Sequence, residues 1–248
     1  MTQETKIISS RSNDLVKQVI ALKEKKHRDA TSSFIIEGDH LFSMAKSRNV
    51  ILKVFCLEAG FDRDEIIVSY DVMKKMSSLK SIPKVLAIVK KPDESITNKK
   101  RLIFLDGIQD PGNMGTIIRT ATAFGFDGII ASYESADFYN QKTIMASQGT
   151  IFSLPLVRMS STNFIAYAKE NKYQIIASSL EKDSGDIKNL KVEDKYILVI
   201  GSEGQGISEV VLKEATNKVI IPINNVDSLN AGVAAGILMY QVKQNTHL

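Results

Sequence analysis

The 248-residue sequence predicts an α/β protein with two domains, the second built on a parallel sheet. Three observations support this. Apolar segments of strand length alternate with helical segments along the chain. Residues 90–100, KKPDESITNKK, are polar and aperiodic, as linkers are. Residues 1–100 hold 19 Lys/Arg against 13 Asp/Glu, a net +6, whereas residues 101–248 hold 13 against 15, a net −2. We therefore predict domains over 1–95 and 101–248.

Composition excludes several classes of protein. Hydrophobic residues make up 44% and charged residues 24%, as in soluble globular proteins. The longest apolar run, Ala231–Tyr240, is too short to cross a bilayer, and the N-terminus lacks a signal peptide's apolar core. The single Cys56 forms no internal disulfide, and His27, His40 and His247 are too scattered for a metal site. We expect a cytoplasmic protein with no metal and no membrane contact.

The first domain begins with an amphipathic segment, residues 12–30, which predicts one helix with a basic end. Its cations are expected to contact a polyanion such as RNA: Lys23, Lys25, Lys26 and Arg28. The remaining pattern predicts a small α/β domain with these segments: a strand and helix over 34–49, strands over 50–58 and 65–70, a helix over 71–79 and a strand over 84–91.

The second domain shows clearer alternation, which predicts a parallel sheet covered on both faces. Helices such as 115–124 and 164–172 separate the predicted strands: 102–108, 128–133, 154–159, 174–180, 196–202 and 218–223. Ligands of such sheets bind beyond the carboxyl ends of the strands. The loops after 102–108, 196–202 and 218–223 are therefore the places to seek a site.

The first loop, DGIQDPGNMGTIIR, contains a tight turn formed by Pro111, Gly112 and Gly115. We expect Asn113 to cap the helix that starts there, with Arg119 one turn after Gly115. The alternative is an ordinary capped helix that carries a surface arginine.

The second loop, VIGSEGQGIS, has three glycines within six residues, so its backbone can turn sharply and approach a ligand closely. The G-x-x-G-x-G spacing differs from the G-x-G-x-x-G of dinucleotide sites, which argues against a Rossmann-type nucleotide enzyme. Glu203 is the candidate functional residue. Its alternative role is a solvated turn carboxylate.

The third loop, IPINNVDSLNAGVAAGILMYQ, leads into a helix of small and apolar residues. We expect Ser228 to be the N-cap and Asn230 to open the first turn. Small residues at three- and four-residue spacing allow another backbone to pack closely on this helix. A plain buried core helix is the alternative, and it is compatible with a functional loop.

Together, NMGTIIR, GSEGQG and SLNAGVAAGILMYQ, each after a predicted strand, resemble the three motifs of the SpoU family of RNA ribose methyltransferases. The resemblance covers residues 101–248. The N-terminal sequence also resembles the family's substrate-binding domain, which has the fold of ribosomal protein L30e. One departure is the turn NNVD after Ile223, where the family has a glycine and one more residue. Asn224 or Asn225 is expected to take the left-handed conformation there.

This resemblance implies a trefoil-knotted C-terminal methyltransferase domain after an L30e-like domain. It implies a homodimer with the active site at the subunit interface, and S-adenosylmethionine held mostly by main-chain groups at Gly201, Ile221 and Leu229. The implied activity is transfer of a methyl group to a ribose 2′-hydroxyl. The RNA substrate is expected to be 23S ribosomal RNA, with transfer RNA as the alternative substrate. The alternative function is that of a catalytically inactive RNA-binding protein with the same fold.

The resemblance also implies roles for five side chains. Arg119 is expected to anchor a phosphate and stabilise the alkoxide that forms at the 2′ oxygen, because a guanidinium stays protonated in proteins. Asn113 would orient the ribose, and Glu203 would fix Arg119 or Asn230. Ser228 and Asn230 would hold the third loop against the cofactor. Ahead of the helices that follow them, the three loops contain no Phe or Tyr, which favours ribose over base chemistry.

Overall fold

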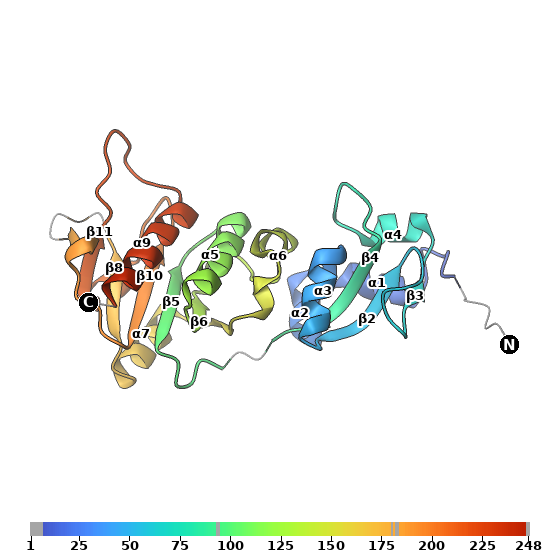
Figure 1. Cartoon of the computed structure of the whole chain (residues 1–248), viewed down its shortest axis with the longest axis horizontal. Coiled ribbons are helices and arrows are strands. Elements are labelled where there is room, and N and C mark those ends of the chain that lie inside the picture. The colour runs from blue at the N-terminus through green and yellow to red at the C-terminus, as the bar shows by residue number, and fades with distance from the viewer. Residues whose placement is uncertain (1–6, 93–94, 180, 182–183, 247–248) are drawn as a thin grey trace.

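The structure, a computed structural model, describes residues 7–92, 95–179, 181 and 184–246. It contains a four-stranded sheet in the N-terminal half and a seven-stranded sheet in the C-terminal half, and the two lie side by side along the long axis (Figure 1). Within these residues no helix is long and apolar enough to cross a membrane.

The N-terminal sheet has the strand order β1-β4-β2-β3, and only its β2-β3 pair is parallel. Its strands are β1 (Ser33–Glu37), β2 (Ile51–Cys56), β3 (Ile66–Ile67) and β4 (Val85–Lys90), and its helices are α1 (Asp14–Ala21), α2 (Lys25–Thr31), α3 (Asp39–Ser47) and α4 (Tyr70–Met76). Successive side chains of a strand point to opposite faces. Leu86 and Ile88 of β4 thus share a core cluster with α1 and α4, whereas Ala87 shares another with α3.

One prediction for this half was wrong, and another was right only in part. The single helix over 12–30 is broken into α1 and α2. The Arg28 guanidinium donates to the carbonyl oxygens of Leu22, at 2.8 Å, and Lys23, at 2.7 Å, which a continuous helix would use internally. The strand over 65–70 shrinks to two residues because Ser69 caps α4, its hydroxyl accepting from the Val72 amide.

The seven-stranded sheet has the order β7-β6-β5-β10-β8-β11-β9, and each pairing is parallel. Its strands are β5 (Arg101–Asp106), β6 (Gly128–Ala131), β7 (Leu156–Arg158), β8 (Gln174–Ser178), β9 (Gly185–Asp186), β10 (Tyr196–Gly201) and β11 (Asn217–Ile220). Its helices are α5 (Pro111–Phe124), α6 (Gln141–Ser147), α7 (Ser161–Glu170), α8 (Glu209–Leu212) and α9 (Ala231–Asn245), with short 3-10 turns at Thr150–Phe152 and Ile187–Asn189. The predicted parallel sheet is confirmed.

Helices cover both faces of this sheet, as its nearly continuous apolar strands predict. Ile103 and Leu105 of β5 belong to the core under α5, α6 and α9. Leu102 and Phe104 point the other way, and the Phe104 ring stacks on Phe164 of α7 with centroids 3.8 Å apart. Both faces are therefore closed, and the carboxyl edge is where a ligand can enter.

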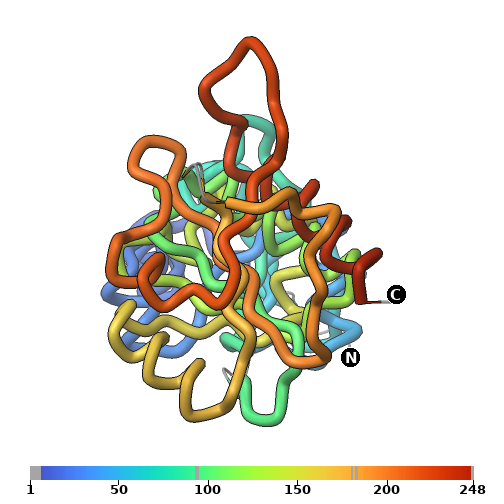
Figure 2. The backbone as a smooth tube through the Cα atoms, turned by 90° about the vertical axis from the view of Figure 1, so that its left-hand side faces the viewer, coloured from blue at the N-terminus to red at the C-terminus, as the bar shows by residue number. Residues whose placement is uncertain are grey.

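At that edge the chain leaves β11 at Ile220, three residues before the predicted end. The loop over residues 221–230 then stands away from the body before α9 begins, as Figures 1 and 2 show. Asn225 has φ of 64°, which confirms that one of the two asparagines takes the left-handed conformation. The implied trefoil knot stays a prediction.

Candidate active site

The glycine-rich loop after β10 is a closed turn. Ser202 and Gly206 exchange backbone hydrogen bonds of 3.1 and 3.0 Å. A Cβ on Gly201 would lie 2.2 Å from the carbonyl carbon of Gly206, so only glycine fits there. Asp106, at the end of β5, accepts from the Ser208 amide at 2.8 Å and anchors the far side of the turn. Asp106 was not predicted from the sequence, although a carboxylate that ends an apolar strand is a visible signal.

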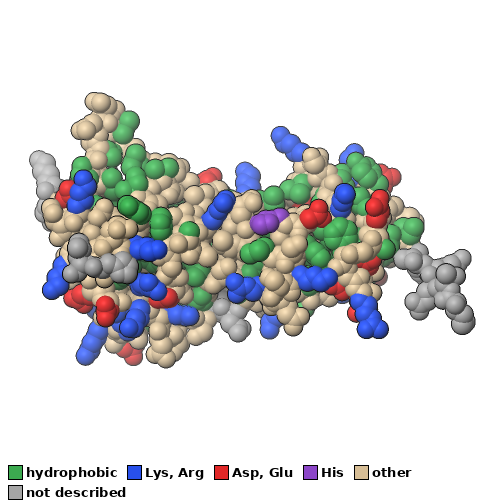
Figure 3. All heavy atoms as spheres, in the orientation of Figure 1, with side chains coloured by type: hydrophobic (Ala, Val, Ile, Leu, Met, Phe, Trp, Pro, Cys, Tyr) green, Lys and Arg blue, Asp and Glu red, His purple; other side chains and the backbone are tan. Residues whose placement is uncertain are grey.

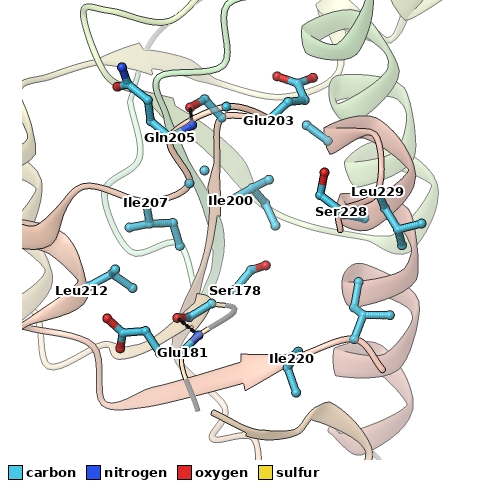
Figure 4. A pocket seen from close by; sticks show the side chains of 18 of the residues that line it. Ser178, Glu181, Ile200, Glu203, Gln205, Ile207, Leu212, Ile220, Ser228 and Leu229 are labelled. Carbon is cyan, nitrogen blue, oxygen red and sulfur yellow. Dashed lines mark hydrogen bonds between the residues drawn. The ribbon is translucent and has the colours of Figure 1, made fainter. Parts of the chain in front are cut away.

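A cavity of about 500 Å³ opens beside this turn, at the carboxyl edge of the sheet. Its lining includes five of the residues singled out from the sequence: Gly201, Glu203, Ile221, Ser228 and Leu229. Figure 4 shows Glu203 at one end, Glu181 toward the other, and the apolar side chains of Ile200 and Ile207 between them. The volume and the mostly apolar wall with a few polar groups are typical of small-molecule sites.

Asn113 connects the three predicted loops. It does not cap α5, as was predicted, because Asp110 does so: its Oδ1 accepts from the Asn113 amide at 2.8 Å, and Pro111 fills the first helical position. The Asn113 side chain is therefore available for other contacts. Its Nδ2 donates to Oε1 of Glu203, and its Oδ1 accepts from Nδ2 of Asn230 at 3.0 Å.

Asn230 is the N-cap of α9, so the prediction that Ser228 caps this helix was wrong. Its Oδ1 accepts from the amides of Gly232, at 3.0 Å, and Val233, at 3.2 Å, leaving Nδ2 for Asn113. Ser228 lies in the preceding loop and lines the cavity instead. We call the chain Glu203–Asn113–Asn230 the amide bridge. It holds together one side chain from each of the three loops.

Arg119 lies apart from this bridge. Residues of an α-helix are spaced about 100° apart, so Arg119, six positions after Asn113, points about 120° away from it. The side chain is exposed and is not among the residues that line the cavity. Within the described ranges its guanidinium has no ion-pair partner, and Glu203 contacts Asn113 rather than Arg119.

The four basic residues of the first domain occupy different environments. Lys25 pairs with Asp29, and Lys26 with Glu24 at 3.0 Å. Lys23 donates to the Ser77 carbonyl at 3.1 Å. These three lysines are exposed, whereas Arg28 is only 6% exposed. Figure 3 shows positive side chains spread along the visible face rather than gathered in one patch. In this conformation the Arg28 side chain is therefore buried against other parts of the protein.

Two further arrangements were missed from the sequence, one at the cavity and one in the first domain. Ser178, the last residue of β8, and Glu181, just after it, line the cavity because β8 lies between β10 and β11 in the sheet. In the first domain, a hollow of about 560 Å³ between α1 and α4 is lined by Arg11, Lys17 and Lys75 among others. Neither arrangement has a local sequence signal, because both depend on which elements become neighbours.

The close contact at Gly201 gives a test of the cavity. For the S-adenosylmethionine that the resemblance implies, Gly201→Ala is expected to weaken binding about tenfold or more, because its methyl group would push the turn into the cavity. Gly204→Ala is the matched control, since a Cβ there meets no atom within 4 Å. Isothermal titration of both variants measures this. Equal affinities for the two would show that the turn does not shape the cofactor site.

Comparisons with known proteins agree with this geometry. Residues 100–240 match the SpoU rRNA Methylase family, and residues 13–87 match the MRM3-like substrate binding domain. The chain is 29% identical to the Bacillus subtilis 23S rRNA (guanosine(2553)-2′-O)-methyltransferase RlmP, over 96% of this chain and 99% of that protein.

Two solved structures share nearly the whole fold. The rRNA methyltransferase from Sinorhizobium meliloti is 28% identical, with a TM-score of 0.87 over 98% of this chain and 99% of that one. Its AdoMet-bound form is 29% identical, with a TM-score of 0.85 over 97% and 98%. That protein therefore holds the methyl donor on the same fold.

Proposed function

The chain belongs to the SpoU rRNA methylase family, and from this premise we propose that it methylates one ribose 2′-hydroxyl in 23S ribosomal RNA. It is an S-adenosylmethionine-dependent RNA methyltransferase. The observation that carries the proposal is the amide bridge, which joins the three loops beside a cavity of cofactor size. An inactive RNA-binding protein would have no need for this arrangement.

The residues of the cavity fit S-adenosylmethionine. Gly201 leaves room for a ligand against the main chain, and we propose that Ile221 and Leu229 enclose the adenine ring. Glu203 places negative charge beside a ligand whose sulfur is positive, whereas the charge of Glu181 is offset by its ion pair with Lys218. When bound, the cofactor supplies a methyl group on a sulfonium, which an oxygen nucleophile can take up.

The protein's part is to position the ribose and to stabilise charge on its oxygen. We propose that Asn113, whose amide is fixed at both ends by the bridge, offers its remaining N–H to the ribose. Because Glu203 and Asn230 hold it, this donor needs no reorganisation when the substrate binds. Ser228 keeps the 221–230 loop at the cavity wall.

Arg119 is proposed to bind the phosphate next to the target ribose and to stabilise the developing alkoxide, while the hydroxyl proton leaves to water. Its exposure and its place outside the cavity suit a group that meets RNA from another direction. A homodimer would bring the arginine of one subunit to the cavity of the other.

The surface of α9 supports such a homodimer. Val233, Ile237 and Tyr240 are 53%, 40% and 53% exposed and follow one another at helical spacing, which leaves an apolar stripe uncovered. A second copy of the stripe is its natural partner, since isologous dimers pair identical patches. A solution mass equal to one chain, 27.4 kDa, by light scattering would contradict the dimer.

The target is proposed to be ribosomal RNA because the relative RlmP is named for 23S rRNA and the family is named for rRNA. We propose that residues 1–95 bind it through exposed cations, including Lys23, Lys25 and Lys26. Maps of 2′-O-methylation in cells with and without the protein are expected to differ at one position of 23S rRNA. A difference found only in transfer RNA would overturn the target.

A further inference from the structure

A buried ion pair joins the two halves of the chain. Arg28 of α2 and Asp137 of the loop between β6 and α6 approach to 2.5 Å, with side chains only 7% and 15% exposed. The same guanidinium also donates to the carbonyl oxygens of Leu22 and Lys23, which directly follow α1. We call the segment Ser132–Asn140 the 132–140 loop. Its Asp137 is thus tied to the first helices of the N-terminal half.

Apolar contacts continue this junction. Phe34 of β1 lies 4.7 Å from the Tyr139 ring and 5.9 Å from Phe152, centroid to centroid, and all three are buried. Met44 of α3 packs so closely on Gly149 that a Cβ there would lie 2.8 Å from it. One core cluster therefore extends through both sheets, so the halves are not joined by a linker alone.

The 132–140 loop is itself rigidly held. The guanidinium of Arg158, from β7, donates to the carbonyl oxygens of Ser132 at 3.0 Å, Tyr133 at 3.2 Å and Ser135 at 2.7 Å, and also to that of Ala136. A planar guanidinium that bonds four carbonyls fixes the path of the backbone. A movement of Asp137 is therefore expected to shift the whole 132–140 loop, because the loop cannot deform locally.

The other end of this loop supports the start of α5. The hydroxyls of Ser132 and Ser135 accept from the amides of Gly107, at 3.0 Å, and Ile108, at 3.1 Å. The Ala136 amide donates to the Ile108 carbonyl at 2.7 Å. Residues 107–110 lead directly into α5, which carries Asn113 and Arg119. A continuous set of contacts therefore runs from α2 to the proposed active site.

We propose that the 132–140 loop fixes the N-terminal half relative to α5, with Arg28 and Asp137 as positioning residues, and thereby sets which nucleotide of a bound RNA reaches the cavity. The proposed positioning role rests on the proposed function. Two halves that rotated freely would present many nucleotides to one cavity. The Sinorhizobium structure overlaps both halves at once, which supports a fixed placement.

The test uses the full-length chain with Asp137→Asn, which strands a buried guanidinium and loosens the junction. The kcat for RNA methylation is expected to fall about tenfold, since small misplacements of reacting groups have large effects on rate. The Kd values for RNA and for S-adenosylmethionine are expected to stay within about twofold, because neither binding surface changes. Proteolysis between residues 91 and 100 and the radius of gyration in X-ray scattering should both increase.

Asp62→Asn is the matched control, since Asp62 forms a partly exposed pair with Lys46 at 3.5 Å within the N-terminal half. Asp137→Glu keeps the charge and is expected to retain most of the kcat. If Asp137→Asn kept wild-type kcat, scattering and proteolysis, the positioning role would be excluded. Failure of the proposed function would give a different result. The wild-type protein would then methylate no ribose, while X-ray scattering would still show whether Asp137→Asn loosens the contact between the two halves.

Discussion

Replacing Arg119 by alanine is expected to lower the rate of RNA methylation at least about 100-fold, roughly 3 kcal/mol, while S-adenosylmethionine affinity stays nearly unchanged. The side chain is exposed, lies outside the cavity, and makes no ion pair in the part of the chain that the structure describes. Its removal therefore leaves the cofactor site intact. What is lost is the positive charge for the RNA phosphate and the forming alkoxide.

The matched control for this variant is Arg101→Ala. Arg101 is a half-exposed arginine at the amino end of β5, paired with Asp127 at 3.5 Å, on the edge of the sheet opposite the cavity. It is expected to retain wild-type turnover. Arg119→Lys keeps the charge but not the planar fork that matches a phosphate, so an intermediate rate is expected. Near-normal turnover of Arg119→Ala would remove this residue from the mechanism.

Most of the strands and the three loops could be predicted from the sequence because each depends on local pattern, whereas the two-residue β9 has no such pattern and was missed. Glycines that crowd after an apolar strand indicate a close backbone approach, and Gly201 makes one. The helix caps were harder. Asp110 and Asn113 are both good caps three positions apart, and Pro111, which is suited to the first turn, decides between them. The same ambiguity applied to α9, for which both Ser228 and Asn230 were possible N-caps.

Arg28 shows why the rest could not be predicted. In the sequence it belongs to a basic run, and nothing nearby marks it as buried. Its partner, Asp137, lies 109 positions away, and only the packing of the two halves brings them together. Glu181 is similar: it reaches the cavity because β8 is inserted between β10 and β11 in the sheet, an order that sequence periodicity does not reveal.

The atom that receives the methyl group distinguishes ribose methylation from base methylation. Alkaline cleavage of RNA requires the 2′ oxygen to attack its neighbouring phosphate, so a 2′-O-methyl group leaves one linkage intact, whereas a methylated base does not. The three loops that surround the site, 107–110, 202–208 and 221–230, carry no aromatic side chain on which a flipped-out base would stack. Ribose chemistry is therefore expected.

The measurement is the alkaline ladder of 23S rRNA after incubation with the protein. A single gap is expected on the 3′ side of one nucleotide, and it should require both S-adenosylmethionine and Arg119. RNA treated with Arg119→Ala provides the control, since that variant is expected to bind the cofactor normally. Methyl incorporation into the RNA with an unbroken ladder would contradict ribose methylation and, with it, the roles assigned to Asn113 and Arg119.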